Sequence, residues 1–177
     1  MANLSEKSRR ILDRIRQDRP DAIASVADFR GELTLVVEPA QVLALCQYLR
    51  DEPDLQFNLL EDIVADDMFP DYPRFAVSYH LYSIPHNHAV RLRAPVEDPD
   101  EGPDTLAPVW PVATWLETEV YDLMGIRFKG NNRLRRLFMP EDWQGHPLRK
   151  DYPLGYEEVQ FSFNWKAIRA RKPHPQE

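Results

Sequence analysis

The sequence predicts an α+β fold, in which a mainly antiparallel sheet carries helices packed on one face and a long extended C-terminal strap follows. Apolar and polar residues alternate in strand-like fashion between residues 24 and 96, and helix-like spacing interrupts them. From residue 140 onward, closely spaced prolines and glycines forbid a long regular element. We therefore expect an α+β domain over residues 1–125 and an extended, partner-binding C-terminal segment over residues 126–177.

A helix and a hairpin are expected first. Apolar residues at near-helical spacing in residues 4–19 predict an amphipathic helix that Pro20 stops. The small number of these apolar residues favours loose packing, although the basic side of the helix could touch a membrane surface or an acidic partner. Residues 24–30 and 32–37 alternate and are rich in β-branched side chains, so they predict two strands joined at Gly31.

A second helix and a three-stranded meander are expected next. Residues 39–50 carry an apolar stripe broad enough to be buried, and Cys46 within it is expected to be a small buried hydrophobe. Strand-like alternation follows in residues 55–64, 74–83 and 89–96. Residues 66–73 form an acidic, turn-rich loop before the second of these strands.

The helix after Pro111 should end at Gly125, a residue typical of the position just past a helix. Its expected apolar face consists of Val112, Trp115, Leu116, Leu123 and Met124. Glu117, Thr118 and Tyr121 are expected to point elsewhere, and residues 126–128 to form a short strand. Further on, alternation at Val159, Phe161 and Phe163 predicts an extended segment that adds to the sheet edge of a partner. Residues 166–177 are expected to be disordered until bound.

Length and composition set limits on function. The 177 residues suffice for one domain with a real core. A single cysteine excludes an intramolecular disulfide and a self-contained iron–sulfur cluster, which needs about four protein ligands. No apolar run approaches the roughly 20 residues of a membrane span, and the N-terminus shows no hydrophobic signal core. We therefore expect a protein kept in the cytosol that can still sit on a membrane assembly.

Charge is unevenly distributed along the chain. The net charge of −7 argues against a general nucleic-acid binder. Residues 51–71 hold eight carboxylates and no lysine or arginine, whereas residues 127–151 hold seven basic side chains and three carboxylates. Such polarity suits a subunit that meets different partners on different faces, although charge alone favours chance clustering on a solvated surface.

Histidines and carboxylates are the residues of this sequence that could form a catalytic or metal site. His86 and His88 lie two residues apart near His80, but no third ligand stands at a zinc-motif spacing, so histidines that fill a turn are favoured. Glu117 and Glu119 point about 200° apart on a helix and cannot pair unaided. Glu119 and Asp122 are neighbours on one face, either as a carboxylate cluster or as a salt-bridged helix surface. We expect no catalytic, cofactor-binding or metal-binding residue.

Basic and aromatic residues in residues 110–151 predict a docking surface. Arg133, Arg135 and Arg136 could clamp carboxylates bidentately, and Phe138 and Trp143 add the aromatic side chains enriched at protein interfaces. The same mixture could form an RNA platform, which the acidic remainder of the chain makes the weaker alternative. No glycine-rich phosphate-binding motif occurs in the sequence.

The segment WLETEVYDLMGIRFKGNNRLRRLFMPEDWQGHPLRKDYPL resembles the characteristic region of the thirty-kilodalton (C-type) subunit of the proton-pumping NADH–quinone oxidoreductase, respiratory complex I. The family pattern E-R-E-x-x-D-x-x-G-I-x-F-x-G-H-P-x-L-R-R-I is matched from Glu117 to Arg136, and G-H-P-L-R-K-D-Y-P without a gap from Gly145 to Pro153. Two departures are Thr118 in place of the arginine and residues 131–132, two asparagines, in place of His-Pro. Thr118 puts in doubt the ion pair that the arginine would carry. The two asparagines remove an imidazole, so no proton-transfer role is expected there.

The resemblance implies a structural subunit of the peripheral arm that bears no cofactor and supports electron transfer from NADH through iron–sulfur clusters to quinone, coupled to proton translocation. It implies that the isolated chain is not catalytic. The implied partners are the D-type quinone-site subunit and the cluster-bearing B- and I-type subunits, which would carry FMN and the clusters, at the cytoplasmic face of the cell membrane. No nucleic acid and no membrane span are implied.

The implied interface residues are Glu117, Glu119, Asp122, Arg135, Arg136, His146, Pro147, Arg149, Lys150, Asp151 and Tyr152. Residues 133–153 would form a strap lying along the D-type subunit. Two alternatives stay open at this point. One is the corresponding small subunit of a membrane-bound hydrogenase or of a ferredoxin–quinone oxidoreductase. The other, of a different class, is an RNA-binding module that uses the arginine-rich strap.

Overall fold

The computed structural model describes residues 4–153 and 161–171. The α-helices are α1 (Glu6–Asp18), α2 (Val42–Asp51), α3 (Ala113–Met124) and α4 (Trp165–Arg171). Short 3-10 helices are η1 (Pro39–Gln41) and η2 (Pro99–Glu101). The strands are β1 (Ser25–Phe29), β2 (Glu32–Val36), β3 (Leu59–Asp67), β4 (Phe75–Ser83) and β5 (His88–Val96).

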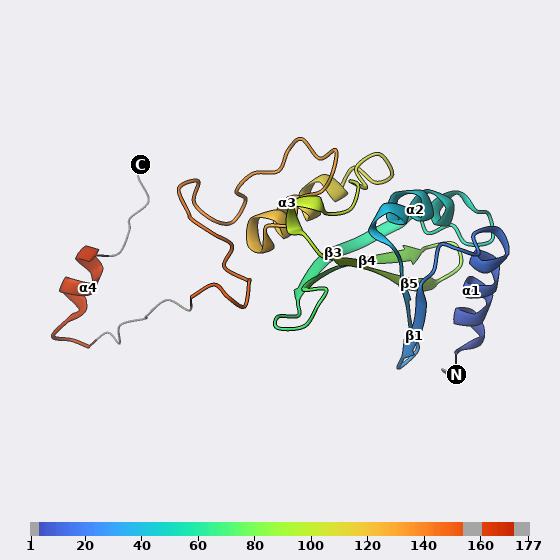
Figure 1. The fold of residues 1–177 in the computed structure, drawn as a ribbon, viewed down its shortest axis with the longest axis horizontal. Helices are drawn as coiled ribbons and strands as arrows, with labels where there is room; N and C mark the ends of the chain where they lie inside the picture. Colours follow the sequence, from blue (N-terminus) through green and yellow to red (C-terminus); the bar gives the residue numbers. More distant parts are fainter. Residues whose placement is uncertain (1–3, 154–160, 172–177) are drawn as a thin grey trace.

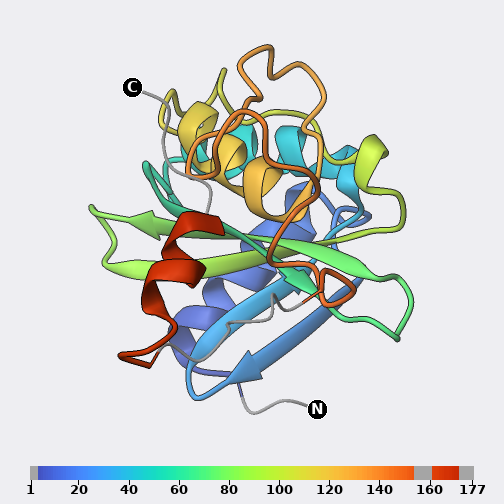
Figure 2. The same ribbon diagram turned by 90° about the vertical axis from the view of Figure 1, so that its left-hand side faces the viewer.

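The strands form one twisted sheet in the order β1-β2-β5-β4-β3 (Figure 1). Neighbouring strands are antiparallel except β2 and β5, which run parallel with Leu35 opposite Leu92. The predicted hairpin β1-β2 and meander β3-β4-β5 are therefore confirmed. Helices α1, α2 and α3 lie on one face of the sheet (Figure 2), so the predicted α+β class is confirmed as well.

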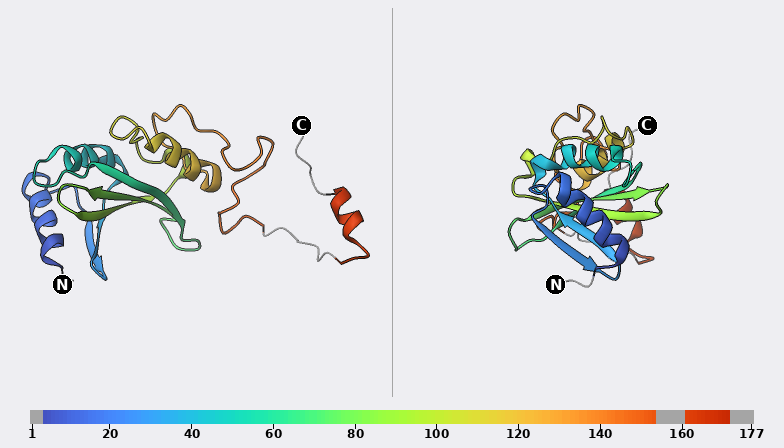
Figure 3. Two further views of the ribbon diagram at one scale, coloured as in Figure 1. Left: turned by 180° about the vertical axis from the view of Figure 1, so that it is seen from behind. Right: turned by 90° about the vertical axis from the view of Figure 1, so that its right-hand side faces the viewer.

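One hydrophobic core fills the space between this sheet face and the three helices. Cys46 lies in it, fully buried as predicted, and burial raises the pKa of its thiol. Helix α1 is bound more tightly than its few apolar residues predicted, because Ile11 and Ile15 are no more than 2% exposed. The Ser8 hydroxyl also donates to Asp28 of β1 at 3.1 Å, and Figure 3 shows α1 beside the β1-β2 hairpin.

Strand β3 begins at Leu59, later than predicted, and runs on to Asp67 through part of the predicted acidic loop. Leu55 and Phe57 are buried as a strand pattern requires, but they belong to the turn that follows α2. Gln56 between them has a positive φ of 43°, and the N–H of Phe57 donates to a carbonyl of α2 at 2.9 Å. A tight turn at the C-terminal end of α2 thus gives the same alternation of buried and exposed residues as a strand.

The C-terminal part of the chain is irregular up to residue 153. Residues 130–153 contain no helix or strand, which confirms the prediction made for the chain from residue 140 to residue 153. The strand predicted at residues 126–128 is wrong, because within the described chain these residues form no strand and a single bridge follows them, between Lys129 and Asp104. Among the described residues, no helix is both long and apolar enough to cross a bilayer.

Helix α4 corrects the prediction that the chain after residue 166 is disordered, at least as far as Arg171. Phe161 and Phe163 stack on each other at 5.3 Å just before this helix and not in an extended strand. Val159 and residues 172–177 lie outside the described residues. Figure 1 draws α4 apart from the layered body of the molecule.

Candidate functional site

Helix α3 carries the acidic half of the motif, and two of its carboxylates are fully buried. Glu117 and Asp122 are 0% exposed, whereas Trp115 is 51% exposed. The predicted apolar face is therefore wrong at Trp115 and Glu117, and at Val112, which is 46% exposed; it is right at Met124, which is buried, and at Leu116, which packs against the core. Thr118 is also buried and donates its hydroxyl to the carbonyl of Thr114 at 2.6 Å, so it needs no charged partner.

Glu117 joins α3 to the segments before and after it. Its Oε2 accepts from Oγ1 of Thr105 at 2.6 Å and from Nδ2 of Asn131 at 2.9 Å. Its Oε1 accepts from the backbone N–H of Leu106 at 2.7 Å. Burial raises the pKa of Glu117 above its ordinary value, although the three donors act in the opposite direction. Asn131, a departure from the family pattern, is thus a donor to a buried carboxylate.

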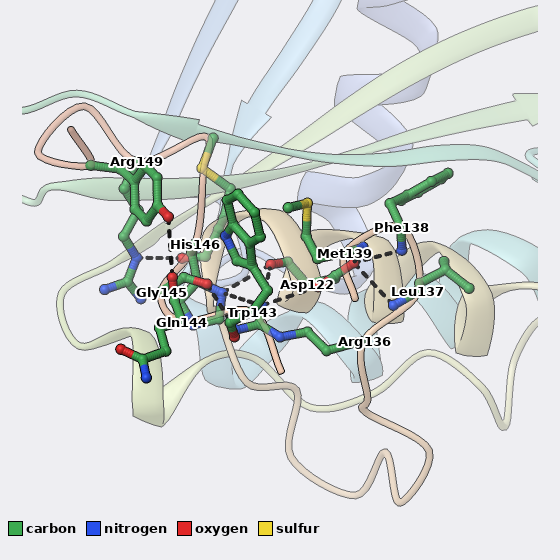
Figure 4. Close-up of polar contacts among 12 residues, drawn as sticks. Asp122, Arg136, Leu137, Phe138, Met139, Trp143, Gln144, Gly145, His146 and Arg149 are labelled. Carbon is green, nitrogen blue, oxygen red and sulfur yellow. Dashed lines mark hydrogen bonds and ion pairs between the residues drawn. The ribbon is translucent and has the colours of Figure 1, made fainter. Parts of the chain in front are cut away.

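The carboxylate of Asp122 binds the chain segment that follows α3 (Figure 4). Its Oδ2 accepts from three successive backbone N–H groups, those of Leu137 at 3.0 Å, Phe138 at 2.7 Å and Met139 at 3.0 Å. Its Oδ1 lies 3.1 Å from Nη1 of Arg136. Burial by itself would raise the pKa of Asp122, but the three N–H groups and the guanidinium together hold it below its ordinary value. An ionised carboxylate therefore fixes this loop.

The second half of the motif closes the C-terminal end of α3. The last carbonyls of a helix lack intrahelical partners and must find donors elsewhere. Nδ1 of His146 donates to the backbone carbonyl of Asp122 at 2.9 Å. The N–H of Leu148 donates to the carbonyl of Leu123 at 3.1 Å, and Nε of Arg149 donates to the carbonyl of Met124 at 2.6 Å. Burial lowers the pKa of His146, and the nearby guanidiniums act in the same direction. Nη2 of Arg136 adds bonds to the carbonyls of Trp143 and Gly145, both at 2.8 Å.

Gly125 lets the two halves of the motif approach each other. Its φ of +76° is a left-handed conformation that favours glycine, and its N–H donates to Tyr121 at 2.8 Å. A Cβ at this position would lie 2.5 Å from Cδ2 of His146 and would also overlap the guanidinium of Arg149. The motif glycine therefore leaves the space in which these two side chains cap α3.

Lys150 and Asp151 are held against the loop between β3 and β4. Arg74 bonds both Asp67, with Nη2 to Oδ2 at 2.7 Å, and Asp151, with Nη2 to Oδ1 at 2.7 Å. The backbone N–H of Lys150 donates to Asp67 at 2.8 Å, and its Nζ donates to the carbonyl of Phe69 at 3.1 Å. The Arg74 guanidinium holds the pKa of Asp67 well below its ordinary value.

The remaining predicted interface residues lie nearer the surface. Tyr152 donates its hydroxyl to the carbonyl of Gln144 at 3.2 Å, and Pro147 is half-buried. Within the described part of the chain, the side chains of Glu119 and Arg135 make no hydrogen bond or ion pair. Glu119 and Asp122 do not form a shared carboxylate site, because both oxygens of Asp122 serve the loop that follows α3.

His86 and His88, two of the candidate metal ligands, are bonded to backbone carbonyls. Nε2 of His86 lies 3.0 Å from the carbonyl of Pro53, and Nε2 of His88 lies 3.2 Å from that of Leu55. The two rings stack at 5.5 Å. In residues 4–153 and 161–171, no group of three or more histidine, cysteine, aspartate or glutamate side chains is placed to hold a metal ion.

Sequence reasoning missed the residues that complete these networks. Thr105, Asn131, Asp67 and Arg74 were not singled out as site residues. Arg74 and Asp67 lie 77 and 83 residues from the motif positions that they contact, so no local pattern relates them. Asn131 carried the only signal, because it stood at a position where the family pattern has another polar residue.

The geometry favours an anchoring role for these charged side chains. The carboxylate oxygens of Glu117 and Asp122 accept hydrogen bonds from groups of the same chain. These bonds fix two loops and the segment after α3. A general acid or base needs a proton-transfer partner within hydrogen-bond reach of a substrate. The arrangement instead builds a rigid surface from irregular chain, because most of its bonds tie backbone or side chains of the irregular segments to α3 or β3.

Comparisons with known proteins agree with this motif. The model of the family described as "Respiratory-chain NADH dehydrogenase, 30 Kd subunit" matches residues 35–158. The chain is 44% identical over 167 residues to the C-type subunit of NADH-quinone oxidoreductase from Roseiflexus sp., covering 94% of this chain and 96% of that protein. It is 46% identical over 154 residues to the corresponding protein of Geotalea uraniireducens, covering 87% and 92%. A solved trypsin-resistant fragment of Nqo5 matches with a TM-score of 0.55 and 33% identity, covering 70% of this chain and 96% of the fragment.

Proposed function

The chain belongs to the family of the 30 kDa subunit of the respiratory-chain NADH dehydrogenase, and we propose that it serves as a structural subunit of the peripheral arm of NADH–quinone oxidoreductase. In this role it holds no cofactor itself. It supports electron transfer from NADH through iron–sulfur clusters to quinone, coupled to proton translocation. The observation that carries the proposal is the family match, which spans residues 35–158 and includes both halves of the motif.

The proposed partners are the D-type quinone-site subunit and the cluster-bearing B- and I-type subunits, with FMN and the clusters held by partners. We place the assembly at the cytoplasmic face of the cell membrane, where this subunit is peripheral. The relatives described above carry the name of an NADH-quinone oxidoreductase subunit, which favours this complex over a hydrogenase or a ferredoxin-dependent relative.

We propose that residues 126–177 form the partner-binding segment and that the motif divides into two sets. Members bonded inward, such as fully buried Asp122 and partly buried Arg149, shape the surface by folding the segment back onto α3. Exposed members, such as Arg135 and Lys150, are available to touch a neighbouring subunit. The division follows from burial and bonding, because a side chain that is covered by its own chain, or whose polar atoms are bonded within it, is not available to another protein.

Purification of the tagged chain from its own membranes tests the proposal. The cluster-bearing neighbours should co-purify with it, and the same fraction should oxidise NADH with a quinone as acceptor. The purified solitary chain should show neither a redox centre in its absorption spectrum nor turnover. A tagged chain that is folded and membrane-associated but brings down none of these neighbours would contradict the proposed function.

A further inference from the structure

A hollow lies on the outer side of α3, where the segment after the helix crosses it. Its volume is about 400 Å³, and its lining includes Thr114, Trp115, Thr118, Arg133, Leu134 and Arg135. Trp115 is 51% exposed there, although it is a large aromatic residue on a helix whose other side is buried. Tryptophan and arginine are among the residues most enriched at the energetic centre of protein interfaces.

The two arginines of the hollow have no partner in their own chain. Within the described residues, the guanidiniums of Arg133 and Arg135 make no hydrogen bond, ion pair or ring contact, whereas adjacent Arg136 is bound to Asp122 and to two carbonyls. The described lining of the hollow contains no carboxylate. Two unpaired guanidiniums therefore lie in the same hollow as the exposed ring of Trp115, in a protein whose net charge is −7.

The hollow is also held in shape before any partner arrives. Its floor is α3, and the backbone N–H of Arg133 donates to Oδ1 of Asn131 at 2.9 Å. Nδ2 of Asn131 in turn donates to buried Glu117 at 2.9 Å. A preorganised site loses little conformational freedom on binding, which increases its affinity for a partner.

We propose that this hollow binds an acidic segment of a neighbouring protein subunit, whose carboxylates pair with Arg133 and Arg135 while an apolar side chain covers Trp115. The inference rests on the proposed function, which supplies the neighbouring subunit, and it adds the chemistry of the contact. Guanidinium groups bind carboxylates bidentately, so two of them in one hollow select a segment with at least two acidic residues. A nucleic acid is disfavoured, because the carboxylates elsewhere on the protein repel phosphate.

Charge reversal in the full-length chain tests the proposal within the native complex. The variant R133E/R135E should reduce co-purification of neighbouring subunits at least about tenfold, because interface residues of this kind each contribute a tenfold or larger factor to affinity. The control R9E/R16E makes the same change in net charge at two arginines of α1 that are exposed and lack side-chain bonds in the described structure. It should leave co-purification unchanged, and R133K/R135K should lose less than the charge reversal.

A photo-reactive p-benzoylphenylalanine at Thr114 identifies what occupies the hollow. Irradiation of the assembled complex should yield a cross-linked peptide of a neighbouring subunit that contains at least two acidic residues near the linked position. The yield should fall with R133E/R135E and not with R9E/R16E. Cross-links to RNA, to phosphatidylglycerol or to a peptide without acidic residues would overturn the proposal.

The outcomes separate this inference from the proposed function. If the wild-type chain brings down the subunits and R133E/R135E does so equally well, the hollow is not the contact, although the function stands. If the wild-type chain brings down none of them, the proposed function fails first. Thermal unfolding of each variant checks that it folds, and Thr114 cross-linking in the otherwise unchanged chain decides the question if R133E/R135E does not fold.

Discussion

Replacing Asp122 by alanine is expected to be the most damaging single change in the motif. Asp122 is 0% exposed, and its carboxylate accepts three backbone N–H groups and one guanidinium bond. Its removal leaves three backbone donors without acceptors, each at a cost of about 1–3 kcal/mol when buried. It also leaves Arg136, whose side chain is 18% exposed, without its opposite charge.

The energies of these bonds do not add fully, because the freed loop can move and reach water. We therefore expect Asp122→Ala to lower the free energy of unfolding by about 3–5 kcal/mol, the range found when one partner of a buried ion pair is removed. A domain of ordinary stability has about 5–15 kcal/mol in total, so the variant should still fold at low temperature with a much lower unfolding midpoint.

Urea denaturation followed by tryptophan fluorescence measures this change, with Glu119→Ala as the control. Glu119 lies on the same helix, is only half-buried and makes no side-chain bond in the described structure, so its loss should change stability by less than about 0.5 kcal/mol. Amide exchange should accelerate selectively at Leu137, Phe138 and Met139 in the Asp122 variant. A loss below about 1 kcal/mol, or an equal loss in both variants, would refute the role assigned to Asp122.

Four further predictions concern stability and use the same denaturation assay. Glu117→Gln should lower the free energy of unfolding less than Asp122→Asn does. The hydroxyl and amide partners of Glu117 can exchange donor and acceptor roles, whereas the backbone N–H groups and the guanidinium around Asp122 can only donate. Burial raises the pKa of Glu117, so the wild type should lose stability as the pH rises from the ordinary glutamate pKa to that raised pKa, and the glutamine variant should lack this loss. Gly125→Ala should cost at least about 1 kcal/mol more than Gly31→Ala, because both glycines have positive φ but only the first new Cβ meets the side chains that cap α3. The depressed pKa of Asp67 stabilises the protein above the ordinary aspartate pKa, so stability should fall between about pH 5 and pH 3 in the wild type and less steeply in Asp67→Asn. If the stability of Asp67→Asn fell with pH as steeply as that of the wild type, the role of Asp67 would be contradicted. Equal losses of stability in Glu117→Gln and Asp122→Asn, or in Gly125→Ala and Gly31→Ala, would contradict the contacts assigned to those residues.

The fold class could be predicted because periodicity reports burial directly. The alternation in β2, β4 and β5 and the stripe of α2 arise from contact with one core, so the sequence alone located these elements. The start of β3 could not be predicted in this way. Leu55 and Phe57 are buried on either side of Gln56, whose left-handed backbone leaves no mark in the pattern of apolar residues.

The buried side of α3 could not be predicted from hydrophobic spacing, for a physical reason. Hydrophobic spacing placed Trp115 inside and Glu117 outside, since a buried carboxylate is unfavourable unless donors surround it. The donors for Glu117 come from residues 105, 106 and 131, and those for Asp122 from residues 136–139. Such partners are fixed only once the loops have folded, so no local pattern on the helix reveals them.

The same burial explains how one motif can serve both folding and assembly. A chain without regular structure presents a defined surface only if its backbone is fixed, and residues 130–153 gain that rigidity from Asp122, His146 and Arg149. Arg135 and Arg136 are adjacent in sequence, yet Arg136 is bonded inward and Arg135 has no bond among the described residues. Assigning the whole motif to a partner interface therefore overstates the contact, and assigning it all to stability leaves Arg135 and Trp115 unexplained. The inward side chains set the position of the outward ones, so a change at Asp122 should weaken assembly through shape, whereas a change at Arg135 should weaken it while leaving stability intact.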